Sequence, residues 1–218
     1  MMSNLFSSFD PSTTLFISLN WISMMCILMI LPNKFWVQES RNSMIKKMIM
    51  NKINQEMKFI YNNKQMLMIL KSMFLFILIM NLMGLIPYMF TPTSHISISM
   101  AMALPIWMTM ILFSWINETN LMFAHLLPMN TPILIAPFMI LVESLSNFIR
   151  PISLSVRLTA NMIAGHLLMT LLGNINKINT IYLIFMIQVS LMMFEIAVSF
   201  IQAYVFSILM TMYSSEIP

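Results

Sequence analysis

Charged side chains are scarce in this sequence. Only 8% of its 218 residues are Asp, Glu, Lys or Arg, whereas an ordinary soluble domain carries about 25%. Hydrophobic residues make up 59%, and too few polar groups remain to cover a globule in water. A soluble fold is therefore excluded. The long apolar runs indicate membrane-spanning helices, and the short alternating segments of an outer-membrane barrel are lacking.

Cysteine and early basic residues are also rare. Cys26 is the single cysteine, so an internal disulfide is excluded. The first thirty residues hold Asp10 but neither Lys nor Arg, and they resemble neither a secretory signal nor an import peptide. No glycine-rich phosphate loop is present, and the three histidines show no zinc or iron–sulfur spacing. We therefore expect no ATP site, metal or cofactor in this chain.

Methionine, in contrast, is abundant, with 29 residues. Met fills irregular apolar gaps, yet packing alone does not require so many. The alternative explanation is codon usage in an AT-rich genome where an isoleucine-type codon reads as Met. Together with the lack of an import signal, this composition indicates synthesis inside a mitochondrion.

Three apolar runs in the first half are long enough to cross a membrane core of about 30 Å. They cover residues 13–31, 66–90 and 96–116, the last with a kink or break near Pro105. Residues 117–131 then form a short connection.

Residues 34–65 form a basic, amphipathic segment between the first two runs. Residues 34–71 contain eight of the eleven Lys and Arg residues. An apolar face at helical spacing predicts a helix lying on a membrane surface; it consists of Ile45, Ile49, Ile53, Met57 and Ile60. The flanking spans argue against nucleic acid as a partner. By the positive-inside rule, this segment faces the matrix and the N-terminus lies in the intermembrane space.

The last two apolar segments are too long for perpendicular spans. Residues 132–173 and 178–213 would form helices of about 60 and 50 Å, roughly twice the membrane thickness. Either they are broken at Pro151 or a similar point, or both are steeply tilted. The short link between them makes an antiparallel hairpin, and its polar stripes favour tilt. Residues 1–218 are thus predicted to be one all-α polytopic membrane domain, with about five membrane helices, one amphipathic surface helix and a matrix C-terminus.

Polar side chains run along both long segments. On the first they are Glu143, Ser153, Arg157, Asn161 and His166, and on the second Gln188, Glu195, Ser199 and Gln202. Four-residue spacing places Ser153, Arg157 and Asn161 on one helix face, while His166 points to about the opposite side. Ionisable groups at membrane depth are costly and therefore suggest a function.

Two interpretations of these stripes are open. Carboxylates, an imidazole and amides can pass protons through water. Arg157 cannot lose its proton, so it would separate two half-paths and attract a carboxylate brought by a partner. Alternatively, Arg157 pairs with Glu143 or Glu195 and holds the hairpin together, and the amides make helix–helix contacts. Arg150, beside Pro151, is interpreted as a charge at a kink.

Several stretches resemble one family. SLSVRLTANMIAGHLL (153–168) and FEIAVSFIQAYVF (194–206) are similar to subunit a of mitochondrial F-type ATP synthases. The resemblance extends over the whole chain through MMSNLFSSFDPST (1–13), NLMGLIPYMFTPTSH (81–95) and AHLLPMNTPILIAPFMILVESLSNFIRP (124–151). The ending YSSEIP looks like that of insect, organelle-encoded members. MNTP at 129–132 departs from the family, which has Gln-Gly before Thr-Pro in this loop.

The resemblance implies a role for each polar residue. Arg157 would be the essential arginine that faces a ring of proteolipid subunits, and Glu143 the acid of the matrix half-channel. His166 and Glu195 would serve the intermembrane-space half-channel. Asn161 and Gln202 would line these paths. From their spacing on the same helix faces, Ser153, Ser199 and Gln188 are predicted to form a secondary polar path. The last two helices would lie nearly in the membrane plane.

The resemblance also implies the setting of the protein. It would be a non-catalytic proton-channel subunit in the mitochondrial inner membrane, and ATP chemistry would take place on other subunits. Its partners would be the proteolipid ring, the peripheral stalk, other membrane subunits and lipids.

The alternative functions are a proton-coupled secondary transporter, a proton-pumping subunit of a respiratory complex, or a purely structural scaffold. A secondary transporter predicts inverted repeats, and none is visible.

Overall fold

The computed structural model describes residues 5–12, 18–25, 37–38, 40–61, 63–86, 89–127, 131–174 and 181–216. Within these ranges every regular element is helical, so the predicted all-α class is confirmed. Four helices are long and apolar enough to cross a membrane: α3 (Lys64–Gly84), α4 (Ile96–Asn117), α6 (Ala136–Asn174) and α7 (Ile181–Glu216). The chain is a multi-pass membrane protein. The predicted span 13–31 lies outside the described residues except for 18–25, so five crossings stay a prediction.

Shorter helices occupy the connections. They are η1 (Leu5–Phe9), η2 (Leu19–Ile22), α2 (Arg41–Ile60), η3 (Pro92–Ser94) and α5 (Thr119–His125). The side-chain oxygen of Ser40 accepts a hydrogen bond at the start of α2, and that of Asn63 does so at the start of α3, which are common N-terminal caps. α5 was not anticipated from the sequence.

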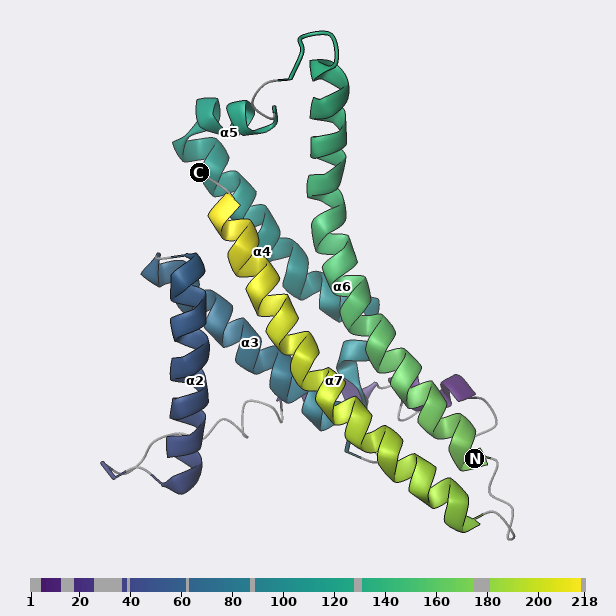
Figure 1. The fold of residues 1–218 in the computed structure, drawn as a ribbon. Helices are drawn as coiled ribbons and strands as arrows, with labels where there is room; N and C mark the ends of the chain where they lie inside the picture. Colours follow the sequence, from purple (N-terminus) through teal and green to yellow (C-terminus); the bar gives the residue numbers. More distant parts are fainter. Residues whose placement is uncertain are drawn as a thin grey trace.

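The four long helices form a packed group in which α7 contacts α3 and α6, and α6 contacts α4 (Figure 1). α6 and α7 run antiparallel and lie side by side. The core combines buried side chains of α2, α3, α4, α6 and α7, among them Met57, Ile77, Met102, Leu158 and Met210. Many core residues are Met, whose flexible thioether fills irregular space between helices.

Neither interior proline breaks its helix. α4 is continuous through Pro105, and α6 is continuous through Pro151. α6 nevertheless changes direction part-way along its length (Figure 1). A proline removes one backbone hydrogen bond and displaces the preceding turn, so Pro151 accounts for a bend. The sequence left open that residues 132–173 are broken at Pro151, and this alternative is wrong because α6 continues through it.

The buried face of α2 differs from the predicted apolar face. Met50, Ile53 and Met57 are buried against α3 and α7, whereas Ile45 and Ile49 are 56% and 52% exposed. α2 is also tied to α7 by a hydrogen bond of 2.8 Å from the Tyr204 hydroxyl to Glu56 Oε2. Helical spacing predicted that Ile53 and Met57 lie on the apolar face. Which residues of α2 are actually covered depends on how it packs against α3 and α7.

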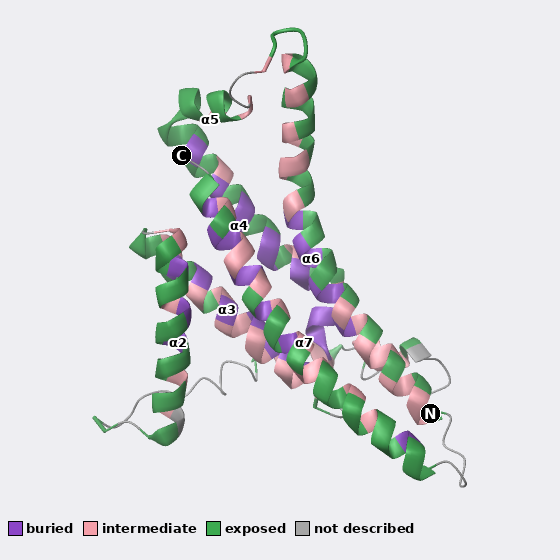
Figure 2. Ribbon diagram, viewed as in Figure 1, coloured by how far each residue is buried: buried purple, intermediate pink, exposed green. Residues whose placement is uncertain are grey.

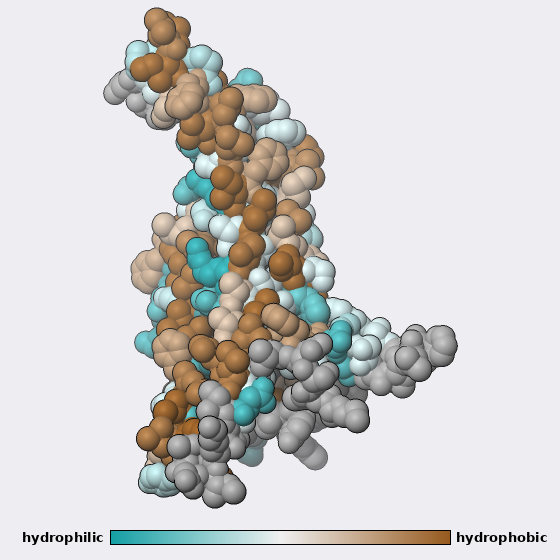
Figure 3. Space-filling model, turned by 90° about the vertical axis from the view of Figure 1, so that its right-hand side faces the viewer, coloured by the Kyte–Doolittle hydropathy of each residue, from teal (hydrophilic) through white to brown (hydrophobic). Residues whose placement is uncertain are grey.

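Much of the apolar surface is not covered by other described residues. Only 6% of the most apolar stretch of α7 is buried, against 39% of the corresponding stretch of α4. Figure 2 shows exposed residues along both α6 and α7, and Figure 3 shows hydrophobic side chains running along one face with isolated hydrophilic patches. Surfaces of this kind face lipid or a partner.

Candidate functional site

Six of the nine predicted polar residues of the two long helices line three separate places. One is a cavity of about 670 Å³ that contains His166, Gln188 and Glu195 among its lining residues, the His166 cavity. A second cavity, of about 490 Å³, contains Glu143, the Glu143 cavity. Between them along α6 lies a small crevice with Arg157 and Gln202, the Arg157 crevice.

The His166 cavity lies at the end of α3, where α6 ends and α7 begins. His166 and Glu195 come from neighbouring helices, and Gln188 lies two turns before Glu195 on α7. Nε2 of His166 and Oε1 of Glu195 are buried without a hydrogen-bond partner among the described residues. Buried polar atoms normally have a partner, and a cavity of this size has room for water.

Gly165 makes the contact between α6 and α7 possible at this point. A Cβ placed on Gly165 would lie 2.9 Å from the carboxyl carbon of Glu195 and 3.0 Å from its Oε1. The carboxyl group of Glu195 therefore occupies the space that any larger residue at position 165 would take.

Arg157 lies on the exposed side of α6. The crevice beside it is formed by Leu154 and Leu158 of α6 and by Gln202, Val205 and Phe206 of α7. No described ion pair includes Arg157. Glu143 lies near Arg150 instead, and one carboxylate oxygen of Glu195 has no partner among the described residues. The structural alternative, in which Arg157 pairs with Glu143 or Glu195, is therefore wrong for the described residues.

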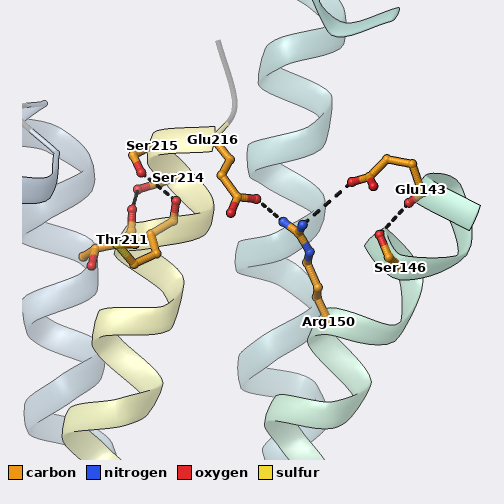
Figure 4. A network of polar contacts seen from close by, with 8 residues as sticks. Glu143, Ser146, Arg150, Thr211, Ser214, Ser215 and Glu216 are labelled. Atoms are coloured by element: carbon orange, nitrogen blue, oxygen red, sulfur yellow. Dashed lines mark hydrogen bonds and ion pairs between the residues drawn. The ribbon is translucent and has the colours of Figure 1, made fainter. Parts of the chain in front are cut away.

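The Glu143 cavity is organised by Arg150. The guanidinium of Arg150 binds the carboxylate of Glu216 and lies 3.8 Å from Glu143 Oε1. Figure 4 shows it between these two carboxylates. The guanidinium carbon also lies 4.8 Å from the ring centre of Tyr213, a cation–π distance. Arg150 thus joins the bent part of α6 to the end of α7, and it is more than a charge at a kink.

The three places are well separated. Glu143 lies fourteen residues before Arg157 and His166 nine residues after it, which on a helix corresponds to about 21 Å and about 14 Å along the axis. The two cavities therefore open at opposite ends of the helix pair, with a permanent cation between them. This arrangement can hold two water-filled half-paths that do not meet within the chain.

Three predicted residues line none of these places. Asn161 is half-buried on α6, and the hydroxyl of Ser153 donates to the carbonyl of Arg150 at 3.0 Å. Ser199 is buried, and its hydroxyl donates to the carbonyl of Ile196 at 2.7 Å. Such hydroxyls bond within their own helix.

Sequence reasoning missed Glu216, Gly165 and the importance of Arg150. The seven-residue repeat of Gln188, Glu195 and Gln202 reaches Glu216 after two more steps, and Glu143, Arg150 and Arg157 repeat in the same way. Seven residues are nearly two turns of helix, so this signal could have found two of the three. No three described His, Cys, Asp or Glu side chains come together to hold a metal ion.

Comparison with known proteins gives the family. A family model described as ATP synthase A chain matches residues 13–215. The chain belongs to the ATP synthase A chain family. Relatives named ATP synthase subunit a are 51% identical in Locusta migratoria and 46% identical in Anopheles quadrimaculatus and Drosophila melanogaster. Each alignment covers 100% of this chain and 100% of the relative. Membership of the ATP synthase A chain family confirms the resemblance seen in the sequence and favours it over the transporter and respiratory-complex alternatives.

Proposed function

We propose that this chain conducts protons through two offset half-channels, as the membrane stator subunit of an F-type ATP synthase. The observation that carries the proposal is the position of Arg157, exposed on a membrane helix between two polar cavities and without an acidic partner among the described residues. A charged group at this depth is costly. A carboxylate carried past it by a moving partner would supply the missing counter-charge.

The half-channel on the intermembrane-space side consists of the His166 cavity. Protons enter it, pass through water between Gln188, Glu195 and His166, and neutralise a carboxylate of the proteolipid ring. Neutralisation removes most of the cost of placing that carboxyl group in lipid, so the ring can rotate.

The half-channel on the matrix side consists of the Glu143 cavity. A protonated carboxyl group that returns from lipid meets Arg157, which favours its ionised form. The released proton leaves towards Glu143, and the Arg150 ion pairs keep Glu143 and Glu216 in place. Gln202 of α7 lines the crevice beside Arg157, while Asn161, Ser153 and Ser199 form the polar surroundings of the path.

Arg157 also prevents a short circuit. A guanidinium stays protonated at any physiological pH, so it cannot relay a proton directly between the half-channels. Each proton must instead travel with the ring, and it releases about 2.3 kcal/mol per 100 mV of membrane potential. The chain itself is non-catalytic in this scheme, because ATP is made on other subunits.

The proposed setting is the mitochondrial inner membrane. The N-terminus lies in the intermembrane space and the C-terminus in the matrix, with residues 34–65 on the matrix side. Residues 13–31, 66–90 and 96–116 are the first three spans, and residues 132–173 and 178–213 form a steeply tilted hairpin that faces the ring. The peripheral stalk, further membrane subunits and lipids cover the remaining surface.

Replacing Arg157 tests the function. In complexes reconstituted into vesicles, Arg157→Ala is expected to abolish proton-driven ATP synthesis, while Lys58→Ala, an exposed basic residue on α2, leaves it unchanged. Normal synthesis by assembled Arg157→Ala complexes would contradict the proposal. Partners are tested by a native gel of solubilised membranes with in-gel ATP hydrolysis. The chain should migrate with the activity and with a small proteolipid, and migration with a redox complex would contradict the assignment.

A further inference from the structure

The N-terminal segment forms one side of the His166 cavity. Its lining residues Ser7, Ser8, Phe9, Asp10 and Ser12 are called the inlet segment here. They face residues of α6 and α7 that follow more than 150 positions later in the chain. The inlet segment also precedes residues 13–215, which match the family.

Two hydrogen bonds hold the inlet segment in this position. The ring Nε2 of His95 lies 3.0 Å from the carbonyl oxygen of Phe9, and because a carbonyl only accepts, this nitrogen donates. The amide of Asn20 donates to the carbonyl oxygen of Asp10 at 3.3 Å. The segment is therefore fixed through its backbone, which leaves the Asp10 carboxylate free to face the cavity.

Aromatic contacts fix the two histidines involved. The His95 ring lies 5.3 Å from the ring of Trp21 and 5.4 Å from that of Phe90. The ring of Phe9 meets that of His166 edge-on, at 6.2 Å between centres and 87° between planes. Edge-to-face contacts of this kind are favourable. The inlet segment thus contacts the half-buried imidazole of His166 through Phe9, and the next residue, Asp10, also lines the cavity.

The charged residues that line the His166 cavity also favour proton entry. Among the described residues, the titratable groups that line the His166 cavity are Asp10, His166 and Glu195, and none of these lining residues is Lys or Arg. Asp10 is exposed, whereas His166 and Glu195 are half-buried. A cleft lined by charges of one sign concentrates ions of the opposite sign, so an outer carboxylate at this mouth raises the local concentration of protons.

We infer that the inlet segment is a built wall of the intermembrane-space half-channel and that Asp10 is its outermost proton-binding group. Asp10 binds a proton from solution and passes it through water to Glu195 and His166. His95 is a positioning residue, because it holds the segment through the Phe9 carbonyl. This inference rests on the proposed function and adds to it a residue from the opposite end of the chain.

The test measures ATP synthesis by whole complexes in vesicles while the proton concentration on the Asp10 side is varied. Asp10→Asn is expected to raise the proton concentration for half-maximal rate by at least about threefold at low salt, with the maximal rate unchanged. The shift should shrink as salt rises above about 0.1 M, where screening acts over about 10 Å. Asp10→Glu, which keeps the charge, should behave as the unchanged protein.

His95→Phe tests the positioning role, since Phe keeps the aromatic packing and lacks the donor. It should produce a similar shift, and the double variant His95→Phe/Asp10→Asn should shift no further than either alone, because both changes remove the same effect. An unchanged half-maximal proton concentration in Asp10→Asn, or an equal shift in Asp10→Glu, would overturn the inference. Arg157→Ala measured in the same vesicles keeps the two ideas distinguishable. If it blocks synthesis while Asp10→Asn changes nothing, only the role of Asp10 fails.

Discussion

Arg150 and Arg157 lie seven residues apart on α6 but have opposite surroundings. Arg150 binds Glu216, lies near Glu143 and covers the ring of Tyr213. Arg157 has none of these partners and is exposed beside Gln202. A guanidinium whose charge is already compensated joins helices, whereas one without an acidic partner is available to a carboxylate from outside the chain.

The role of Glu143 in proton release can be tested by a substitution that keeps the neighbouring ion pair of Arg150 with Glu216. We expect Glu143→Gln to slow proton-driven ATP synthesis by about tenfold, because a neutral amide cannot accept the released proton. Assembly should persist, since Arg150 keeps its ion pair with Glu216. Glu118→Gln is the matched control, as Glu118 is an exposed acid that lines none of the three places described. Wild-type flux in Glu143→Gln would remove Glu143 from the path.

Gly165 allows a test of geometry alone. Gly165→Ala puts a methyl group where the Glu195 carboxyl group lies, so this flexible group must move away from its present position in the His166 cavity. We expect about tenfold slower synthesis, equivalent to about 1.4 kcal/mol in the barrier. Helix stability should not fall, because Ala is favoured over Gly in helices by about 1 kcal/mol.

Gly173 provides the control on the same helix. A Cβ at Gly173 meets no atom of the described residues within 4 Å, so Gly173→Ala should synthesise ATP at the normal rate. Equal rates for the two alanine variants would show that the position of the Glu195 carboxyl group does not matter.

The candidate residues of the site stand out in the sequence, whereas the contacts that they make in the structure do not. Glu143, Arg157, His166 and Glu195 stand out because ionisable groups are rare in apolar helices. The ion pair of Arg150 with Glu216 joins positions 66 residues apart, and the contact of His95 with Phe9 joins positions 86 apart. Such contacts depend on how antiparallel helices are aligned, which spacing within one helix does not determine.

At the scale of elements, the apolar runs located the long helices but not their shape. α6 has 39 residues and α7 has 36, so they are about 58 and 54 Å long, against a membrane core of about 30 Å. The sequence left open whether Pro151 breaks α6, and the helix bends and continues instead. Whether a proline breaks or bends a helix depends on the helices packed around it, here α4 and α7.

The bend at Pro151 is predicted to serve the Glu143 cavity. Pro151→Ala restores a backbone hydrogen bond and lets α6 straighten, which moves Arg150 relative to Glu216 on α7. We expect proton-driven synthesis to fall by about threefold in assembled complexes. Pro105→Ala, at the other interior proline, on the exposed side of α4, should have little effect. An unchanged rate in Pro151→Ala would mean that the bend has no part in proton release.

At the scale of the whole molecule, the proposed function requires the two cavities to open on opposite sides of the membrane. The His166 cavity contains Ser12, and the Glu143 cavity contains Ser215. With five crossings, an odd number, these serines lie on opposite sides, and the basic helix α2 lies on the side of Ser215. An even number of crossings would place Ser12 and Ser215 on the same side of the membrane, which does not fit their positions in cavities at opposite ends of the α6 and α7 pair.

Cysteine labelling tests this arrangement, because Cys26 is the single cysteine of the chain. In a Cys26→Ser background, Ser12→Cys should react with a membrane-impermeant maleimide from the intermembrane-space side only, and Ser215→Cys from the matrix side only. Gln55→Cys, at an exposed position of α2, should label from the same side as Ser215→Cys, since basic segments stay on the side of synthesis. Labelling of Ser12→Cys and Ser215→Cys from one side would rule out five crossings, and with them the two opposed half-channels.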